Sequence, residues 1–200
     1  MQQPTPIEQR FNYGDYCHWP DDERWELIDG RPFNMCPTPT RRHQDLVIEI
    51  GAQVHGQLRG GPCKVYVAPF DVRLPEADEA DEEIINVVQP DLSVISDPAK
   101  LDDAGCRGAP DWVVEVLSTG TAAKDQTDKL RLYERHGVRE YWLVHPIDRV
   151  PTVYRLQDGA YGRPLVQPLA GGSDCAAVPG LRIHWPEPEA EPARVPGPLG

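Results

Sequence analysis

The alternation of apolar and polar positions along the chain predicts short strands and two long helices. Around Asp29-Gly30, residues 24–35 hold two short apolar runs, which is the pattern of a β-hairpin with a tight turn. The apolar positions of residues 43–58 recur at helical spacing. Residues 111–118 (DWVVEVLS) are almost continuously apolar, which is typical of a strand buried on both faces.

The remaining segments complete a mixed α/β (α+β) pattern, which predicts a central mixed β-sheet flanked by helices. A second helix is expected over residues 118–138, capped by Ser118, Thr119 or Thr121 and ended by Gly137. We expect a single domain over residues 1–185 and a Pro- and Glu-rich disordered tail over residues 186–200. The other expected strands are residues 64–74, 84–96 with an interruption at Pro90, 140–146 and 150–156, with edge strands in 161–169 and 181–185.

Composition narrows the class of protein. No apolar run approaches the roughly 18 to 20 residues that span a bilayer, and the N-terminus lacks the layout of a signal peptide. We therefore expect a cytoplasmic protein that does not associate with a membrane. The five cysteines form no C-x-x-C pair, which argues against a zinc site. Glycine-rich phosphate loops and a G-x-S-x-G elbow are also missing from the sequence.

The net charge of −12 counts against a protein that binds DNA, because phosphate contacts come from Lys and Arg. Its distribution weakens the objection. Residues 76–83 hold six acids without a base, and we expect them to form a solvated, mobile loop. With the tail after Trp185, this segment accounts for eight of the twelve net negative charges.

Two acidic residues in apolar strands are the first candidates for chemistry. Glu115 stands between Val114 and Val116, where a buried carboxylate costs several kcal/mol unless it is paired or binds a metal. Asp91, directly after Pro90, begins another strand. Two carboxylates on adjacent strands can share one magnesium ion, which would activate water for phosphodiester hydrolysis.

The helix that follows supplies a basic partner. Asp125, Lys129 and Tyr133 are spaced at i, i+4 and i+8, so they share one helix face. On its own, the Asp125–Lys129 spacing is more typical of a solvated surface pair, worth only about 0.3 to 0.5 kcal/mol. The nearby carboxylates favour the interpretation in which Lys129 faces the site.

Three further residues are weaker candidates. Glu26 interrupts an apolar stretch, and a half-exposed strand with alternating faces explains it equally well. Asp71 has the same two interpretations. His43 is a less favoured candidate, because no histidine pair has metal-binding spacing.

Taken in order, these motifs resemble the Uma-two family of restriction endonucleases within the PD-(D/E)XK superfamily. The resemblance runs from about Phe11 to Leu156, and its specific part extends from EVLS through Lys129 and Tyr133 to GVREYWLVHP. It implies a restriction-endonuclease-like core. Two positions depart from the family pattern, Thr119 after EVLS and His145 in the closing strand, and we read both as neutral drift.

The resemblance also implies roles for individual residues. Asp91 and Glu115 would bind Mg²⁺, or Mn²⁺ in its place, with the backbone carbonyl of Val116 as a further ligand. Glu26 would be an additional acidic residue of the site. The superfamily normally has Lys two residues after the Glu, where this chain has Leu117, so the lysine would come from the following helix as Lys129.

The expected function is therefore a magnesium-dependent DNA endonuclease, with a homodimer if both strands are cut. Two alternatives stay open. The first is a catalytically inactive nuclease fold that serves as a binding or assembly module, which the acidic balance and Leu117 favour. The second is a phosphodiesterase acting on RNA or nucleotides, for which a basic groove matters less.

Overall fold

The computed structural model describes residues 9–20, 22–35, 39–118, 124–147, 150–166 and 171–185. The expected tail and the expected cap residues Thr119 and Thr121 lie outside these ranges. The single-domain boundary at residue 185 stays a prediction. Within the described part of the chain, no helix is long and apolar enough to cross a membrane.

A seven-stranded central sheet forms the middle of the fold. It is mixed, because β9 and β10 run parallel while β6–β9, β3–β6 and β10–β11 are antiparallel. In spatial order its strands are β12 (Ala160–Tyr161), β11 (Val150–Gln157), β10 (Glu140–His145), β9 (Trp112–Val116), β6 (Leu92–Ile95) and β3 (Lys64–Val67), and β13 (Leu165–Val166) also pairs with β11.

A second, six-stranded sheet, called here the hairpin sheet, contains the predicted hairpin. The two strands meet in register at Ile28 and Arg31. Asp29 and Gly30 both have positive φ angles, 52° and 74°, as the turn of such a hairpin requires. In spatial order the strands are β2 (Arg31–Asn34), β1 (Trp25–Ile28), β5 (Val87–Val88), β4 (Val72–Arg73), β8 (Gly105–Arg107) and β7 (Leu101–Asp102).

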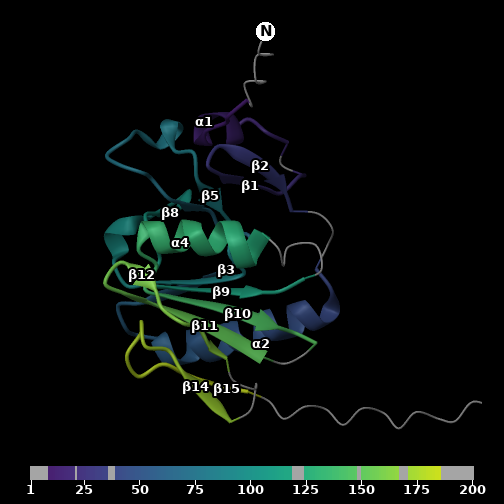
Figure 1. Cartoon of the computed structure of the whole chain (residues 1–200), viewed down its shortest axis with the longest axis vertical. Helices are drawn as coiled ribbons and strands as arrows, with labels where there is room; N and C mark the ends of the chain where they lie inside the picture. The colour runs from purple at the N-terminus through teal and green to yellow at the C-terminus, as the bar shows by residue number, and fades with distance from the viewer. Residues whose placement is uncertain are drawn as a thin grey trace, which may run out of the picture.

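The helices cover both faces of the central sheet (Figure 1). One face carries α2, with the separate two-stranded sheet of β14 and β15 on the same side; the other carries α4, beyond which lies the hairpin sheet. The helical elements are α1 (Tyr13–Tyr16), α2 (Arg41–Leu58), η1 (Asp81–Glu83), η2 (Pro98–Lys100), the π-helical η3 (Asp125–Lys129) and α4 (Leu130–His136); the small sheet is β14 (Gly172–Asp174) and β15 (Arg182–His184).

The alternation of side chains along β9 sets the position of the site. Trp112, Val114 and Val116 pack into the core on the α2 side, while Val113 packs into the core on the α4 side. Glu115 shares the parity of Val113, so its carboxylate faces α4. The prediction of a strand buried on both faces is confirmed, because every residue of β9 is buried.

Three sequence expectations are wrong in detail. Residues 64–74 form β3 and β4, and residues 84–96 form β5 and β6, so each predicted strand is divided between the two sheets. A single apolar run cannot show that the chain leaves one sheet for another at its central proline or loop. Residues 181–185 contribute β15 to the small sheet rather than an edge strand to a larger one.

The acidic segment is more firmly held than a solvated loop. Within it, Asp81 forms ion pairs with Arg73 and with Arg107, the latter at 2.7 Å. Glu76 lies 2.8 Å from Arg135 of α4. Asp78, Glu82 and Glu83 are exposed, as the sequence pattern predicted, and Glu79 is half-buried.

Candidate active site

Glu115 of β9 and Lys129 of η3 form the centre of a buried charged cluster. The Lys129 ammonium lies 2.7 Å from Oε1 of Glu115, and the hydroxyl of Tyr133 donates to the same oxygen at 3.1 Å. All three side chains are almost wholly buried. The helical spacing therefore placed Lys129 and Tyr133 correctly on the face that looks at the strand.

Glu26 of β1 reaches the cluster from the hairpin sheet. Its Oε1 lies 2.7 Å from Nζ of Lys129 and accepts a hydrogen bond from the backbone N–H of Gln89 at 2.9 Å. Its Oε2 lies 2.5 Å from Nζ of Lys124. The alternative of a half-exposed strand position is excluded for Glu26, since the side chain is fully buried.

Asp91 lies beside Glu115 at the C-terminal end of β9. Its Oδ2 accepts the backbone N–H of Val116 at 2.8 Å and lies 3.1 Å from Nε2 of His43 on α2. The backbone N–H of Asp91 lies 3.4 Å from Oε2 of Glu115. At 19% exposure, the Asp91 side chain is the most accessible carboxylate of the cluster.

Asp125 completes the cluster on the helix side. Its Oδ1 lies 3.8 Å from Nζ of Lys129, and its backbone carbonyl accepts a hydrogen bond from the hydroxyl of Tyr141 at 3.1 Å. Both Asp125 and Tyr141 are buried. The Asp125–Lys129 pair is therefore an internal contact, and the solvated-pair interpretation is wrong.

The charges of the cluster do not balance. It contains four carboxylates but two ammonium groups; the acids are Glu26, Asp91, Glu115 and Asp125, and the bases are Lys124 and Lys129. With these six groups ionised and His43, which contacts Asp91, neutral, the cluster carries two negative charges in excess. Such an excess inside a protein is unfavourable without a counter-charge.

Burial and the surrounding charges together shift the pKa values of the cluster. Burial raises the pKa of its carboxyl group to about 8; the Lys129 ammonium opposes the rise and the neighbouring carboxylates add to it. Burial also acts to raise the pKa of Glu26, but the ammonium groups of Lys129 and Lys124 outweigh it and lower that pKa to about 2. Burial lowers and the surrounding carboxylates raise the pKa of Lys129, and the net result lies above its ordinary value, so Lys129 stays charged.

The oxygen donors near Asp91 fit a hard divalent cation. The N–H and C=O of one strand residue point to the same edge, so the bond from Val116 N–H to Asp91 also places the Val116 carbonyl on that edge. Among the described residues, no group of three or more His, Cys, Asp or Glu side chains is arranged to hold a metal. Two carboxylates and one carbonyl instead suit Mg²⁺, which keeps several of its waters.

Two expected residues lie beside the central cluster rather than in it. Asp71 accepts hydrogen bonds from the Tyr16 hydroxyl at 3.0 Å and from the Gln89 side chain at 2.8 Å, and it reaches Glu26 only through Gln89. His43 touches the cluster only through Asp91, and its Nδ1 is buried without a hydrogen-bond partner.

Sequence reasoning missed Lys124 and Gln89. Lys124 precedes Lys129 by five residues, a separation that an α-helix places on different faces. The wider π-helical turn over Asp125–Lys129 brings both lysines to Glu26. No sequence signal announces a π-helical turn, so this pairing was not open to prediction. Gln89 acts through its backbone N–H, which its residue type does not reveal.

Comparisons with known proteins agree with this architecture. A family model described as "Uma2: Putative restriction endonuclease" matches residues 13–186. An uncharacterized protein of Synechocystis sp. is 26% identical over 158 residues, covering 78% of this chain and 79% of its own length. A crystal structure from Anabaena variabilis, described as "a putative nuclease belonging to DUF820", superimposes with a TM-score of 0.64 at 19% identity, over 84% of this chain and 90% of its own. At that identity the match shows the fold, and it confirms the mixed α/β prediction.

Proposed function

Because this chain belongs to the Uma2 family, we propose that it is a magnesium-dependent DNA endonuclease whose active site is the Asp91–Glu115–Lys129 cluster. The observation that carries the proposal is the excess of two carboxylates over ammonium groups in a buried cluster. A divalent cation supplies the missing charge. A purely structural ion-pair network has no need of such an excess.

Asp91, Glu115 and the carbonyl of Val116 would hold the ion. Mg²⁺, or Mn²⁺ in its place, would lower the pKa of a bound water and neutralise charge on the phosphodiester. Hydrolysis then adds the elements of water across one P–O bond: the water oxygen joins phosphorus, and the leaving oxygen takes up a proton.

The chain's own residues would orient these ligands. Lys129 and Tyr133 fix Oε1 of Glu115, which leaves Oε2 directed toward Asp91. Glu26 in turn holds Lys129, so the ammonium is positioned by contacts on two sheets. His43 and the Val116 N–H fix Oδ2 of Asp91. Residues of this kind, locked by partners around a metal ligand, keep the site close to its working geometry.

The position of Lys129 supports an active enzyme in spite of Leu117. In the structure Leu117 packs into the apolar core on the α4 side. A lysine at this position would place its ammonium group among apolar side chains. The ammonium of Lys129 already lies 2.7 Å from Glu115. We further propose that the enzyme acts in the cytoplasm as a homodimer, so that two sites cut the two strands of DNA.

Nicking of supercoiled plasmid DNA tests this function. We expect Mg²⁺ and Mn²⁺ to support nicking by the wild-type chain, EDTA to stop it, and Glu115→Gln to reduce its rate at least 100-fold. Asp103→Asn, on the exposed loop between β7 and β8, is the matched control with the same loss of charge and should cut normally.

Other outcomes identify the alternatives. Equal nicking by wild type and Glu115→Gln would assign the cleavage to a contaminant. DNA binding without metal-dependent cleavage would point to an inactive binding module. Cleavage of RNA or of nucleotide phosphodiesters with DNA left intact would replace the substrate while keeping the chemistry.

A further inference from the structure

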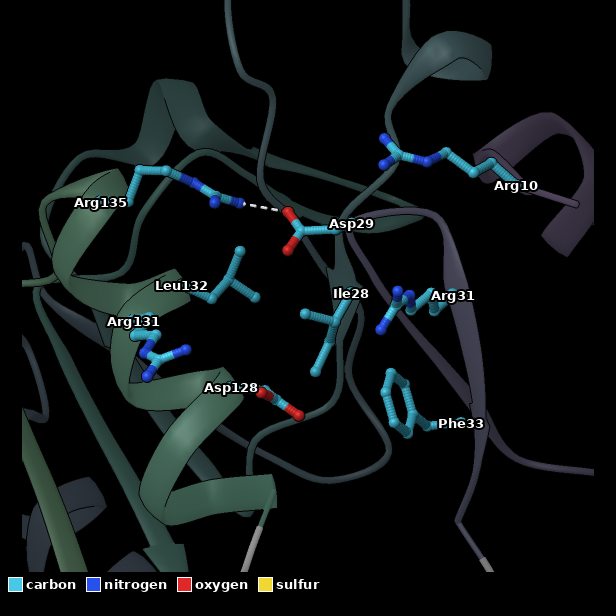
Figure 2. Close-up of a pocket in the computed structure, with 9 residues that line it drawn as sticks. All are labelled: Arg10, Ile28, Asp29, Arg31, Phe33, Asp128, Arg131, Leu132 and Arg135. Atoms are coloured by element: carbon cyan, nitrogen blue, oxygen red, sulfur yellow. Dashed lines mark hydrogen bonds and ion pairs between the residues drawn. The ribbon is translucent and has the colours of Figure 1, made fainter. Parts of the chain in front are cut away.

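A second feature of the molecule is a positively charged cavity beside the cluster. It has a volume of about 530 Å³ and lies between the β1–β2 hairpin and α4, as Figure 2 shows. Such a volume is within the range of ligand-binding pockets, about 300 to 1,000 Å³. The lining of this arginine cavity includes four arginines, Arg10, Arg31, Arg131 and Arg135.

The charge of this lining is opposite to that of the whole chain. Four guanidinium groups face two carboxylates, Asp29 and Asp128, within a protein of net charge −12. Arg135 is engaged by Asp29 at 2.7 Å and by Glu76 at 2.8 Å. Arg10 and Arg131 form no ion pair or hydrogen bond with any side chain in the described ranges.

The backbone holds these arginines near one another. The N–H of Phe11 donates to the carbonyl of Gly30 at 2.8 Å, which anchors Arg10 to the hairpin turn. In Figure 2 the guanidinium of Arg131 points from the helix into the space facing the hairpin. Arginine guanidinium groups are planar and match phosphate oxygens with pairs of hydrogen bonds, so arginines on both walls of one cavity favour a ligand that carries phosphate groups.

The arginine cavity adjoins the candidate active site along the hairpin. Glu26 and Phe33 are directly paired across β1 and β2, as are Ile28 and Arg31, so all four side chains lie on one face. Glu26 and Ile28 are two residues apart, which is about 7 Å along a strand. Lys124, which pairs with Glu26, also lies 5.5 Å from the centre of the Phe33 ring.

The opposite wall repeats this arrangement on the helix. Asp128, Arg131, Leu132 and Arg135 line the cavity at spacings of three and four residues, so they form one helix face. Lys129, the next residue after Asp128, turns into the charged cluster. The hairpin and the helical segment η3–α4 therefore contribute residues to both the arginine cavity and the site.

We infer that the arginine cavity binds the phosphodiester backbone of the nucleic acid on one side of the bond to be cut. This inference rests on the proposed function, because it places the cavity on the path of the same substrate. Arg10 and Arg131 contact phosphate oxygens, and the apolar surface of Phe33, Ile28 and Leu132 receives the adjoining sugar or base. Aromatic side chains accept any base by stacking, so this contact carries no sequence preference.

Binding of a labelled DNA duplex tests the inference apart from cleavage. Fluorescence anisotropy in EDTA would compare wild type with the double variant Arg10→Gln/Arg131→Gln and with Arg59→Gln/Arg163→Gln, a control that removes two exposed arginines far from the cavity in sequence. We expect the cavity variant to bind at least tenfold more weakly. Its slope of log Kd against log salt concentration should fall by about 1.8, because each lost phosphate contact removes about 0.9.

The outcomes separate this inference from the proposed function. Equal affinity and equal salt slope for the cavity and control variants would overturn the inference, as would a wild-type chain that binds no DNA. Plasmid nicking with the same preparations reports on the function independently. If the wild-type chain binds DNA but never cuts it, and only the cavity variant loses binding, the result would support phosphate binding in the arginine cavity and refute the nuclease.

Discussion

Glu115 and Glu140 are two buried acids on adjacent strands of one sheet, and they differ in what surrounds them. Each lies in an otherwise largely apolar strand, β9 or β10, and both side chains are almost wholly inaccessible. The strands are parallel, yet Glu140 lies at the start of β10 and Glu115 near the end of β9. By the alternation of side chains they also face opposite sides of the sheet.

Glu140 is satisfied by its partners. Its oxygens accept hydrogen bonds from the Trp142 indole N–H at 2.6 Å and from the backbone N–H of Ala177 at 2.9 Å. Arg155, 3.6 Å away and partly exposed, balances its charge. Around Glu115, by contrast, the carboxylates outnumber the ammonium groups by two. A lone acid in an apolar strand therefore indicates only that a partner exists, whereas an excess of acids is the feature on which the proposed cation site depends.

Replacing the basic partners of the two glutamates should give the largest difference in stability and activity between the two regions. Lys129→Met leaves buried Glu115 without its ammonium partner and Glu26 with Lys124 alone, so the free energy of unfolding should fall by about 3 to 5 kcal/mol. Nicking should fall at least 100-fold per folded molecule. Arg155→Gln, beside Glu140, removes a half-exposed and distant charge and should cost less than about 1 kcal/mol.

Urea unfolding of both variants, followed by nicking assays in the absence of denaturant, measures these effects. If Lys129→Met proved as stable as Arg155→Gln, Lys129 would not be the charge that compensates the cluster.

Replacing Glu140 should lower the stability of the protein, whereas replacing Glu115 should lower its activity. Glu140→Gln weakens two hydrogen bonds to a charged acceptor and should lower the free energy of unfolding by about 1 to 3 kcal/mol, with the nicking rate of folded protein retained. Glu115→Gln relieves repulsion from Asp91, so the metal-free variant should be as stable as wild type or more so, yet inactive. Thermal unfolding in EDTA gives the stability of each variant, and nicking in Mg²⁺ gives its activity. Loss of activity in both variants would contradict the different roles assigned to Glu115 and Glu140.

The smallest effect is the pH dependence of stabilisation by Mg²⁺. The pKa of Glu115 in the folded protein, about 8, is above its ordinary value of 4.5. Protonated Glu115 therefore contributes stability at low pH, and this contribution is lost as the pH rises from 4.5 through 8. Metal binding requires the ionised form, so the rise in Tm caused by Mg²⁺ should be larger at pH 8.5 than at pH 6.

Glu140→Gln should keep this trend and Glu115→Gln should abolish it. A Tm increment that is the same at both pH values in the wild-type chain would show that Glu115 does not release a proton when the ion binds.

The elements that follow from local patterns could be predicted from the sequence. The hairpin turn at Asp29-Gly30, the buried strand around Glu115, and the helix face of Lys129 and Tyr133 each depend on residues close together in the chain. The same reasoning passed over Glu140, which stands at the start of an apolar run and not inside one. Sequence alone does not show whether an isolated acid meets an indole N–H or other carboxylates.

What the sequence did not predict depends on distant contacts. The divisions of residues 64–74 and 84–96 between two sheets are decided by packing with other strands. The approach of Lys124 to Glu26 depends on a π-helical turn, and the contact of His43 with Asp91 joins α2 to the start of β6. The residues of the cluster were therefore largely predictable, with Glu26 and His43 as candidates, whereas Lys124, Gln89 and the contacts that join distant elements were not.

Binding of Mn²⁺ to the metal-free protein, followed by electron paramagnetic resonance, tests the central claim most directly. The wild-type chain and Glu140→Gln should each bind one equivalent of Mn²⁺ per chain in competition with Mg²⁺, and Glu115→Gln should bind none at the same concentrations. Equal binding by all three proteins, or no binding by the wild-type chain, would contradict the claim that the acid excess around Glu115 is matched by a divalent cation.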